Sequence, residues 1–457
     1  MTSKVYVVTD LGVGDGGKGG VVHKVATMLR VHTVIKRGGA QGSHGVRTSR
    51  GESFAFSQWG CATFEGISTH LSAQMIVSPE GLLNEADALR YQHAVYNPFS
   101  LLTVDERALC TTPFHGIASR LKELARGDAP RGTIGTGVGE AYRDFVRLPD
   151  LAITAKDLGS DLREKLAAVR QQIRTELAPL IEGEFLPEDR KTVAEEVRLL
   201  YDDVFLEHVT KRFTLAGSRA KVVDSSYLGD EILSKDGAAV VESSHGVLSD
   251  REVGFHPHTT AIRTLPRFTR DMLDQAGYSG QIVNLGIFRG YAIRHGAGPM
   301  PTTNLETTDR LVPNSAEDEN RYQGKIRVGP LDFVLLRYAL ASCGGPEAFD
   351  GLAVTWMDQI RANASWSWSD HYSTTLDPLY FLPSGEILVR ERHSLEYQTG
   401  LGQRLSEYKP ELTTMTIDPT LSNDALYAIC ADIVEKSLGV PVRMVSFGPT
   451  ELDKLTK

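Results

Sequence analysis

A glycine-rich loop near the N-terminus carries the residues of this sequence best suited to phosphate chemistry. Residues 12–20 read GVGDGGKGG, between a short apolar run and a segment with helical spacing. Glycines let the backbone N–H groups of such a loop turn inward, and the start of the following helix adds partial positive charge. Residues 12–18 match the phosphate-loop pattern GxxxxGK, but Gly19 stands where that pattern has serine or threonine. We therefore expect a phosphate-binding loop without that hydroxyl group.

Two further side chains could do chemistry beside this loop. Asp15 lies inside it, although a carboxylate repels phosphate, so it fits best as a group that takes a proton or holds a metal ion. Residues 38–45 read GGAQGSHG and include His44. This second loop follows a second strand, and ligands of open α/β sheets bind at the carboxyl ends of the strands. The sequence thus predicts one site formed by both loops.

The elements that position these loops predict an α/β fold. Short apolar runs alternate with helical segments from the N-terminus onward, which is typical of a large, mostly parallel central sheet of the phosphate-loop NTPase kind. We expect a single domain over residues 1–457, with a helical subdomain at about 153–210. The expected helix is 21–29, and the expected strands are 5–8, 33–36, 239–241, 281–285, 352–355 and 442–445.

Composition narrows the class of protein. The net charge of −9 offers no basic surface for nucleic acid. The four cysteines show no CxxC spacing, which favours reduced thiols over a zinc site or disulfides. No run approaches 18 apolar residues, and the N-terminus runs directly into a strand, so we expect no membrane span, no signal peptide and a cytoplasmic location.

Motifs along nearly the whole chain resemble those of the adenylosuccinate synthetase family. The two glycine loops resemble the paired loops of that family, and further segments follow in the family's order. These segments are SPEGLL (78–83), GTGVGEAY (135–142), ESSHG (242–246), GAGPMPT (296–302), GVP (439–441) and SFGP (446–449).

This resemblance implies a ligase. In that family GTP phosphorylates the 6-oxygen of IMP, and the amine of aspartate then displaces the phosphate to give adenylosuccinate. The resemblance implies that Asp15 removes the N1 proton of the purine, which makes the 6-oxygen a nucleophile. It implies that Lys18 and His44 stabilise charge on the transferring phosphoryl group. It also implies Mg²⁺, held by Asp15 with backbone oxygens of Gly42 and Ser43.

The resemblance assigns the nucleotide contacts as well. Trp356 replaces a lysine of the family and could stack on a base, so ATP remains an alternative to GTP. Arg147 stands one place from the arginine that crosses between subunits in the family and could reach a partner's active site, which implies a homodimer. The assigned triphosphate contacts are Gly14, Gly16, Gly17, Gly19, Trp356, Asp358, Ser446 and Gly448. The assigned contacts to the purine nucleoside monophosphate are Gln41, Thr133, Thr136, Arg147, His245 and Thr260.

The expected amino-acid site departs from the family pattern. Its assigned residues are Thr302, Lys325 and Arg327, but residues 322–330 lack the family's threonines and two of its arginines. Losing two charge-assisted hydrogen bonds would cost roughly 3–6 kcal/mol of binding. Three functions therefore stay open: adenylosuccinate formation, the same activation with another amine or a guanine (deoxy)nucleotide, and a non-catalytic nucleotide sensor. The presence of Asp15, Lys18 and His44 together argues against the sensor.

Overall fold

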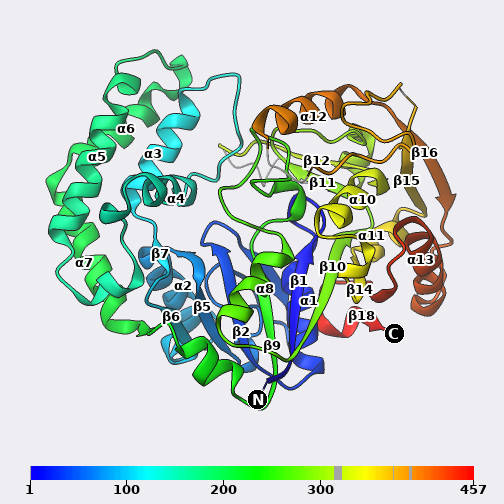
Figure 1. The fold of residues 1–457 in the computed structure, drawn as a ribbon, viewed down its shortest axis with the longest axis horizontal. Coiled ribbons are helices and arrows are strands. Elements are labelled where there is room, and N and C mark those ends of the chain that lie inside the picture. The colour runs from blue at the N-terminus through cyan, green and yellow to red at the C-terminus, as the bar shows by residue number, and fades with distance from the viewer. Residues whose placement is uncertain (1, 313–321, 374, 391–393) are drawn as a thin grey trace.

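An 11-stranded sheet forms the centre of the molecule in the computed structural model, which describes residues 2–312, 322–373, 375–390 and 394–457 (Figure 1). The strand order is β18-β17-β14-β10-β1-β9-β2-β5-β6-β8, with β7 pairing to β5. All pairs are parallel except β17 with β18, which confirms the predicted mostly parallel sheet. The strands are β1 (Thr2–Asp10), β2 (Val31–Gly39), β5 (Ser68–Val77), β6 (Leu102–Asp105), β7 (Leu109–Cys110), β8 (Lys221–Val223), β9 (Gly237–Ser243), β10 (Gln281–Arg289), β14 (Gly351–Thr355), β17 (Val442–Ser446) and β18 (Lys454–Thr456).

The short apolar runs form the strands because both faces of the sheet are covered. Val5, Val7 and Val8 of β1 are all at most 2% exposed, and every predicted strand lies within a strand of this sheet. Helix α1 (Lys18–Met28) begins three residues before its predicted start. Gly17 precedes it with φ 89°, so the chain passes from the glycine loop straight into the helix.

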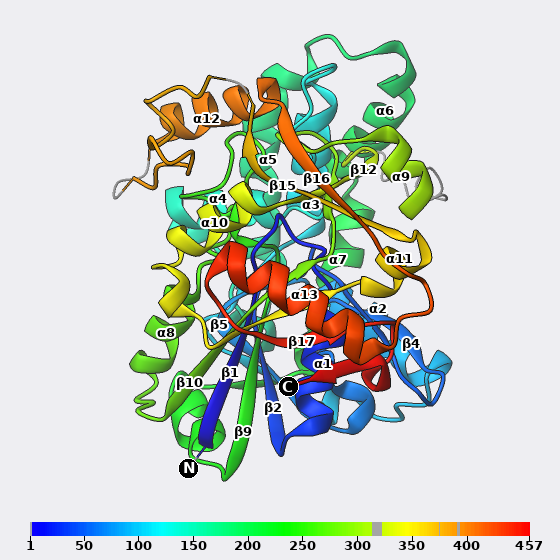
Figure 2. The same cartoon turned by 90° about the vertical axis from the view of Figure 1, so that its right-hand side faces the viewer.

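Two groups of helices flank the sheet (Figures 1 and 2). One group, drawn in cyan to green, contains α3 (Pro113–Leu124), α5 (Arg163–Ile181), α6 (Arg190–Tyr201) and α7 (Asp203–Arg219). The apolar stripe of α5, which includes Leu166 and Ile173, belongs to the same hydrophobic core as the sheet residues Val8 and Val34. The other helices are α2 (Pro79–Gln92), α4 (Val138–Arg147), α8 (Pro266–Gln275), α9 (Leu305–Leu311), α10 (Phe333–Ser342), α11 (Met357–Ala362), α12 (Leu395–Glu407) and α13 (Asn423–Leu438). Among the described helices, none has the length and apolar character needed to cross a membrane.

Two antiparallel strand pairs outside the main sheet carry His44, His295 and Arg327. His44 begins the hairpin of β3 (His44–Arg47) and β4 (Ser53–Phe56). His295 ends β11 (Ala292–His295), which pairs antiparallel with β12 (Ile326–Gly329). A separate small sheet contains β13 (Leu331–Asp332), β15 (Ser365–Tyr372) and β16 (Pro410–Thr416).

Candidate active site

The site lies where parallel strands of the sheet end. The carboxyl ends of β1, β2, β9, β10, β14 and β17 share one edge, because these neighbours pair in parallel. Both glycine loops start there, as does the segment around Trp356 that follows β14. Ligands of open parallel sheets bind at this edge, so the topology brings together segments that are far apart in sequence.

A buried carboxylate organises the phosphate loop from inside. Asp10, at the end of β1, accepts hydrogen bonds from the N–H groups of Gly12 (2.9 Å) and Gly16 (2.8 Å). The ammonium of Lys18 also donates to it, at 2.9 Å, and both side chains are at most 2% exposed. A Cβ atom at Gly16 would lie 2.7 Å from the Asp10 carboxylate, so this arrangement requires glycine there. The loop is thus ordered around an internal anion before any phosphate binds.

The packing of α1 explains the missing hydroxyl group of the phosphate loop. A Cβ atom at Gly19 would lie 2.4 Å from the carbonyl oxygen of Gly45 in β3. The first turn of α1 therefore contacts the backbone of the second loop directly. Serine or threonine cannot occupy this position without moving one of the two loops.

His44 belongs to a buried cluster of charged groups. Its Nδ1 lies 2.6 Å from Glu242 Oε1, and Lys36 donates to the same oxygen at 2.9 Å. The other oxygen of Glu242 accepts from the backbone N–H of Cys61 at 3.0 Å. Glu242 is fully buried, at the end of β9, while Lys36 lies in β2 and His44 starts β3. Three segments of the chain thus meet at one carboxylate, which orients the His44 ring.

Charge compensation fixes the protonation states in this cluster. Burial alone would raise the pKa of Glu242, but Lys36 and His44 outweigh it and hold that pKa far below its usual value. Burial would likewise lower the pKa of Lys36, but the Glu242 carboxylate outweighs it and the pKa rises. Burial lowers the pKa of His44 despite its bond to Glu242. Glu242 and Lys36 therefore form a permanent ion pair beside a neutral imidazole at neutral pH.

Next to these loops lies an open cavity of about 560 Å³. Asp15 lines it, with a side chain 42% exposed and a φ of 60° that turns the residue out of the phosphate loop. The cavity also gathers every residue expected to contact the purine monophosphate: Gln41, Thr133, Thr136, Arg147, His245 and Thr260. Arg147, which the resemblance places at a partner's active site, here lines the cavity of its own chain.

Gln41 and His245 form a polar pair in the cavity wall. The side-chain nitrogen of Gln41 lies 2.8 Å from His245 Nε2. Burial, reinforced by the charge of Lys18, lowers the pKa of His245 to about 4. The imidazole is therefore neutral at neutral pH and accepts a hydrogen bond from the amide. Together they offer hydrogen-bonding groups rather than charges to a ligand.

Trp356 forms an aromatic surface on the other side of the phosphate loop. It follows β14 with φ 63° and is 39% exposed. The Arg289 guanidinium lies 4.2 Å from its ring centroid, and Arg289 also donates to the backbone oxygen of Asp15. Asp358 follows in the first turn of α11. A cation stacked on one face of an indole leaves an exposed aromatic surface that suits a nucleobase.

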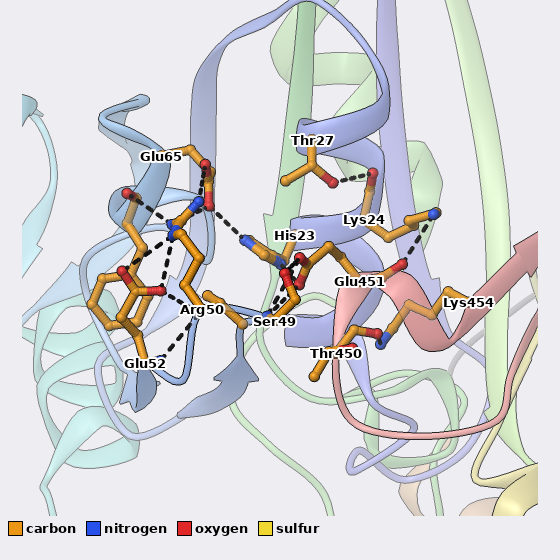
Figure 3. A network of polar contacts seen from close by, with 12 residues as sticks. His23, Lys24, Thr27, Ser49, Arg50, Glu52, Glu65, Thr450, Glu451 and Lys454 are labelled. Atoms are coloured by element: carbon orange, nitrogen blue, oxygen red, sulfur yellow. Dashed lines mark hydrogen bonds and ion pairs between the residues drawn. The ribbon is translucent and has the colours of Figure 1, made fainter.

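The C-terminal segment is tied to α1 by a polar network (Figure 3). Glu451 accepts from the backbone N–H of Ser49 (3.1 Å), and its carbonyl accepts from Lys24 (3.0 Å). Lys454 donates to the carbonyl of Thr450 at 2.8 Å, and burial lowers its pKa to about 8. This network fixes the turn between β17 and β18, where the hydroxyl of Ser446 donates to the carbonyl of Gly448 at 2.8 Å.

Comparison with known proteins agrees with this geometry. The sequence profile described as adenylosuccinate synthetase matches residues 7–454. The chain belongs to the adenylosuccinate synthetase family. Adenylosuccinate synthetases of Parabacteroides distasonis and Bacteroides thetaiotaomicron are 22% and 26% identical to it, each over 98% of this chain and 97% of the relative.

Two solved structures show the same fold. The fully ligated adenylosuccinate synthetase of Plasmodium falciparum superposes with a TM-score of 0.73 at 16% identity, covering 99% of each chain. Succinoaminodeoxyadenylate synthetase of cyanophage S-2L, bound to dGMP and to dATP as an energy donor, gives 0.54 at 15% identity, covering 100% of this chain and 96% of the other. Family membership makes this chain a carbon–nitrogen ligase that uses a nucleoside triphosphate on purine nucleotides.

The residues expected to bind the amino acid are not part of the cavity lining. Among the described residues, the cavity lining contains none of Thr302, Lys325 and Arg327. Arg327 instead donates to the carbonyls of Gly296 and Gly298, each at 2.7 Å. Its cross-strand partner Arg294 donates to the carbonyl of Ala297 at 2.8 Å. Both guanidinium groups thus hold the turn after β11.

The sequence analysis predicted no role in the site for the polar residues Asp10, Lys36, Glu242 and His295. Asp10 and Glu242 are acidic residues at the ends of otherwise apolar strands, which is a signal that could have been read. Lys36 and His295 offered no such signal, because their partners lie far away in sequence. His295 lies 3.2 Å from the Asp15 carboxylate.

Proposed function

We propose that this ligase phosphorylates the 6-oxygen of a purine nucleoside monophosphate, with IMP as the first candidate, and replaces the phosphate with the amine of an amino acid. One observation carries the proposal: the Asp15 carboxylate leaves the phosphate loop and lines the cavity that gathers the expected purine contacts. A carboxylate there can remove the N1 proton of a purine while the triphosphate lies against the same loop. The 6-oxygen then attacks the terminal phosphorus.

The neighbouring groups fit the transfer step. The phosphate loop offers backbone N–H groups and Lys18, which Asp10 orients, to the triphosphate. His44, whose Nδ1 is oriented by Glu242, would stabilise the transferring phosphoryl group by donating its Nε2–H once the charge of the bound triphosphate has protonated the ring. The Asp15 carboxylate and the carbonyl oxygens of Gly42 and Ser43 are the hard oxygen donors that Mg²⁺ prefers, so these residues would hold the ion. Bound there, it would neutralise charge on the triphosphate oxygens.

The identity of the amine donor depends on the residues expected to bind the amino acid. Arg327 is engaged by carbonyl oxygens, and Thr302 and Lys325 lie outside the cavity lining. This arrangement favours an amine donor other than aspartate, while adenylosuccinate formation remains the first reaction to test. Guanine nucleotides, including dGMP, are the alternative purine substrates.

Trp356 and Asp358 are proposed to bind the base of the triphosphate. Its phosphates would lie against the glycine loop, at Gly14, Gly16, Gly17 and Gly19. Ser446 and Gly448 would lie beside the base. The Asp358 carboxylate would accept from guanine N1–H and N2–H₂, which favours GTP, whereas stacking on Trp356 serves adenine equally well. Competitive binding of GTP and ATP to the purified protein tests this preference. Tighter binding of ATP than of GTP would mean that stacking on Trp356, and not hydrogen bonding to Asp358, recognises the base.

A mass-spectrometric screen tests the proposed function. Purified protein is incubated with Mg²⁺, GTP or ATP, one purine monophosphate (IMP, GMP or a deoxy form) and each amino acid in turn. We expect a product whose mass equals purine plus amine minus water, together with one orthophosphate. If no combination consumes triphosphate, ligation is excluded and a nucleotide-sensing role takes its place. A light-scattering mass measurement on the same sample tests the proposed homodimer.

A further inference from the structure

His295 lies against the residue proposed to remove the purine proton. Its Nε2 is 3.2 Å from Asp15 Oδ2, and both side chains line the 560 Å³ cavity. His295 is 24% exposed, so the pair stands at the cavity surface, where a purine would lie against it. The two residues come from β11 and from the loop after β1, and 280 positions of the sequence separate them.

Asp15 needs an external contact to stay in the cavity. Within the phosphate loop, Asp10 already uses Lys18 and the N–H groups of Gly12 and Gly16. In the described part of the chain, the Asp15 carboxylate has one ion-pair partner, the His295 ring. The same carboxylate is proposed to hold Mg²⁺ at the triphosphate and to face the purine, so it needs a contact that keeps it turned towards the purine. The direction in which Asp15 points therefore depends on a group on the far side of the cavity.

His295 is held firmly enough to provide that contact. It pairs with Ile326 in the antiparallel sheet of β11 and β12, and side chains alternate between the two faces of a strand. Arg294 therefore points the other way, where it donates to the carbonyl of Ala297 at 2.8 Å. Arg327 adds hydrogen bonds to Gly296 and Gly298, so the turn that follows His295 is fixed from both strands. Groups on such supported elements orient reactive residues most accurately.

We propose that His295 is a positioning residue that keeps the Asp15 carboxylate facing the purine. This inference rests on the proposed function, because it assumes that Asp15 acts on the purine. The proposal gives Arg294 and Arg327 a role different from amino-acid binding, because they support the strand that holds His295. The rate of purine activation should then depend on His295 even when no amine is present.

Positional isotope exchange measures that activation step alone. A triphosphate with a heavy-oxygen label in the bridge between its β- and γ-phosphates scrambles the label when the phosphoryl group is transferred and returned. With a purine monophosphate and no amine, we expect His295→Leu to slow scrambling about 10–100-fold, as is usual for the loss of a supporting contact. The KM for the triphosphate should change less than threefold, about 0.6 kcal/mol. His295→Gln should recover most of the rate, because its amide N–H can still reach the carboxylate.

A matched control separates this effect from a general loss of structure. His371→Leu removes another imidazole 2.6 Å from a carboxylate, that of Glu411, on the exposed face of β15 and β16. It should scramble label at the wild-type rate. If His295→Leu also scrambles at the wild-type rate but requires more amine, His295 belongs to the amine site and the proposal is overturned.

Crystal structures test the positioning independently of catalysis. With a purine monophosphate bound, the wild-type carboxylate of Asp15 should face the purine beside His295, and in His295→Leu it should turn away. An unchanged Asp15 conformation in the variant would overturn the proposal. If wild-type protein scrambles no label with any purine monophosphate, the proposed function fails, and the crystal comparison alone decides whether His295 orients Asp15.

Discussion

Two regions of the site, on either side of Asp15, are stabilised in different ways. The sheet-edge side, formed by Asp10, Lys18, Lys36, His44 and Glu242, consists of buried charges that are paired with one another. The other side is formed by strands β11 and β12. There Arg294 and Arg327 donate hydrogen bonds to carbonyl oxygens, and the His295 ring is about a quarter exposed. Removing one member of a buried ion pair leaves an uncompensated charge, whereas removing the quarter-exposed His295 ring leaves only its own contact unmade. Substitution of His295 can thus alter the reaction without unfolding the protein.

Asp15 lies between the two sides, and its substitution should have the largest effect on turnover. We expect Asp15→Asn to lower kcat by about two to four decades, because an amide takes no proton from the purine. Triphosphate affinity, measured by calorimetry, should stay within about tenfold (~1.4 kcal/mol), because the loop is ordered by Asp10. Asp432→Asn, at an exposed pair with Lys436 on α13, serves as control. Unchanged turnover in Asp15→Asn would remove Asp15 from the mechanism.

Glu242 tests the sheet-edge side. Glu242→Leu leaves Lys36 buried without its counter-charge, so the free energy of unfolding should fall by about 3–5 kcal/mol. Glu242→Gln keeps an acceptor for the ring N–H of His44 and should cost less. Urea titrations of both variants measure the difference. The exposed pair of Glu207 with Arg163 is the comparison, since Glu207→Gln should change stability by about 1 kcal/mol or less. Equal losses at Glu242 and Glu207 would contradict the distinction between the two sides.

The sequence predicted one part of this site better than the other. Both glycine loops and the strands before them could be predicted, because glycine patterns and apolar runs are local signals. The residues expected to contact the purine line one cavity, and their contacts to a purine stay a prediction. The electrostatic partners could not: Glu242 meets His44 across 198 positions, and His295 meets Asp15 only through the fold. Arg327 carried the right charge for an amino acid, but two backbone carbonyls that no sequence pattern marks already accept its hydrogen bonds.

Trp356 extends the comparison to a half-exposed residue outside the cavity. Trp356→Ala removes an aromatic surface but no buried charge, so we expect stability to change little. The dissociation constant for the triphosphate should rise about 5–150-fold, because a stacked base contributes about 1–3 kcal/mol. Trp356→Phe should recover part of this loss. An unaltered dissociation constant, measured by fluorescence competition, would show that the base binds elsewhere.

His245 has an expected effect that is confined to acidic pH, and it tests whether the cavity wall keeps a single protonation state. Its pKa is about 4 in the folded protein and about 6.5 when unfolded, so between these values the unfolded chain binds more protons. The free energy of unfolding should therefore be undiminished above pH 6.5 and fall as the pH drops from 6.5 towards 4, by at most about 1.4 kcal/mol per pH unit for this group. His245→Gln should remove that part of the slope. His70, whose burial also lowers its pKa to about 4, should keep its own part. Equal slopes in the wild type and the variant, from urea titrations across this range, would mean that His245 has the same pKa in the folded protein as in the unfolded chain, so that the cavity wall becomes charged below about pH 6.5.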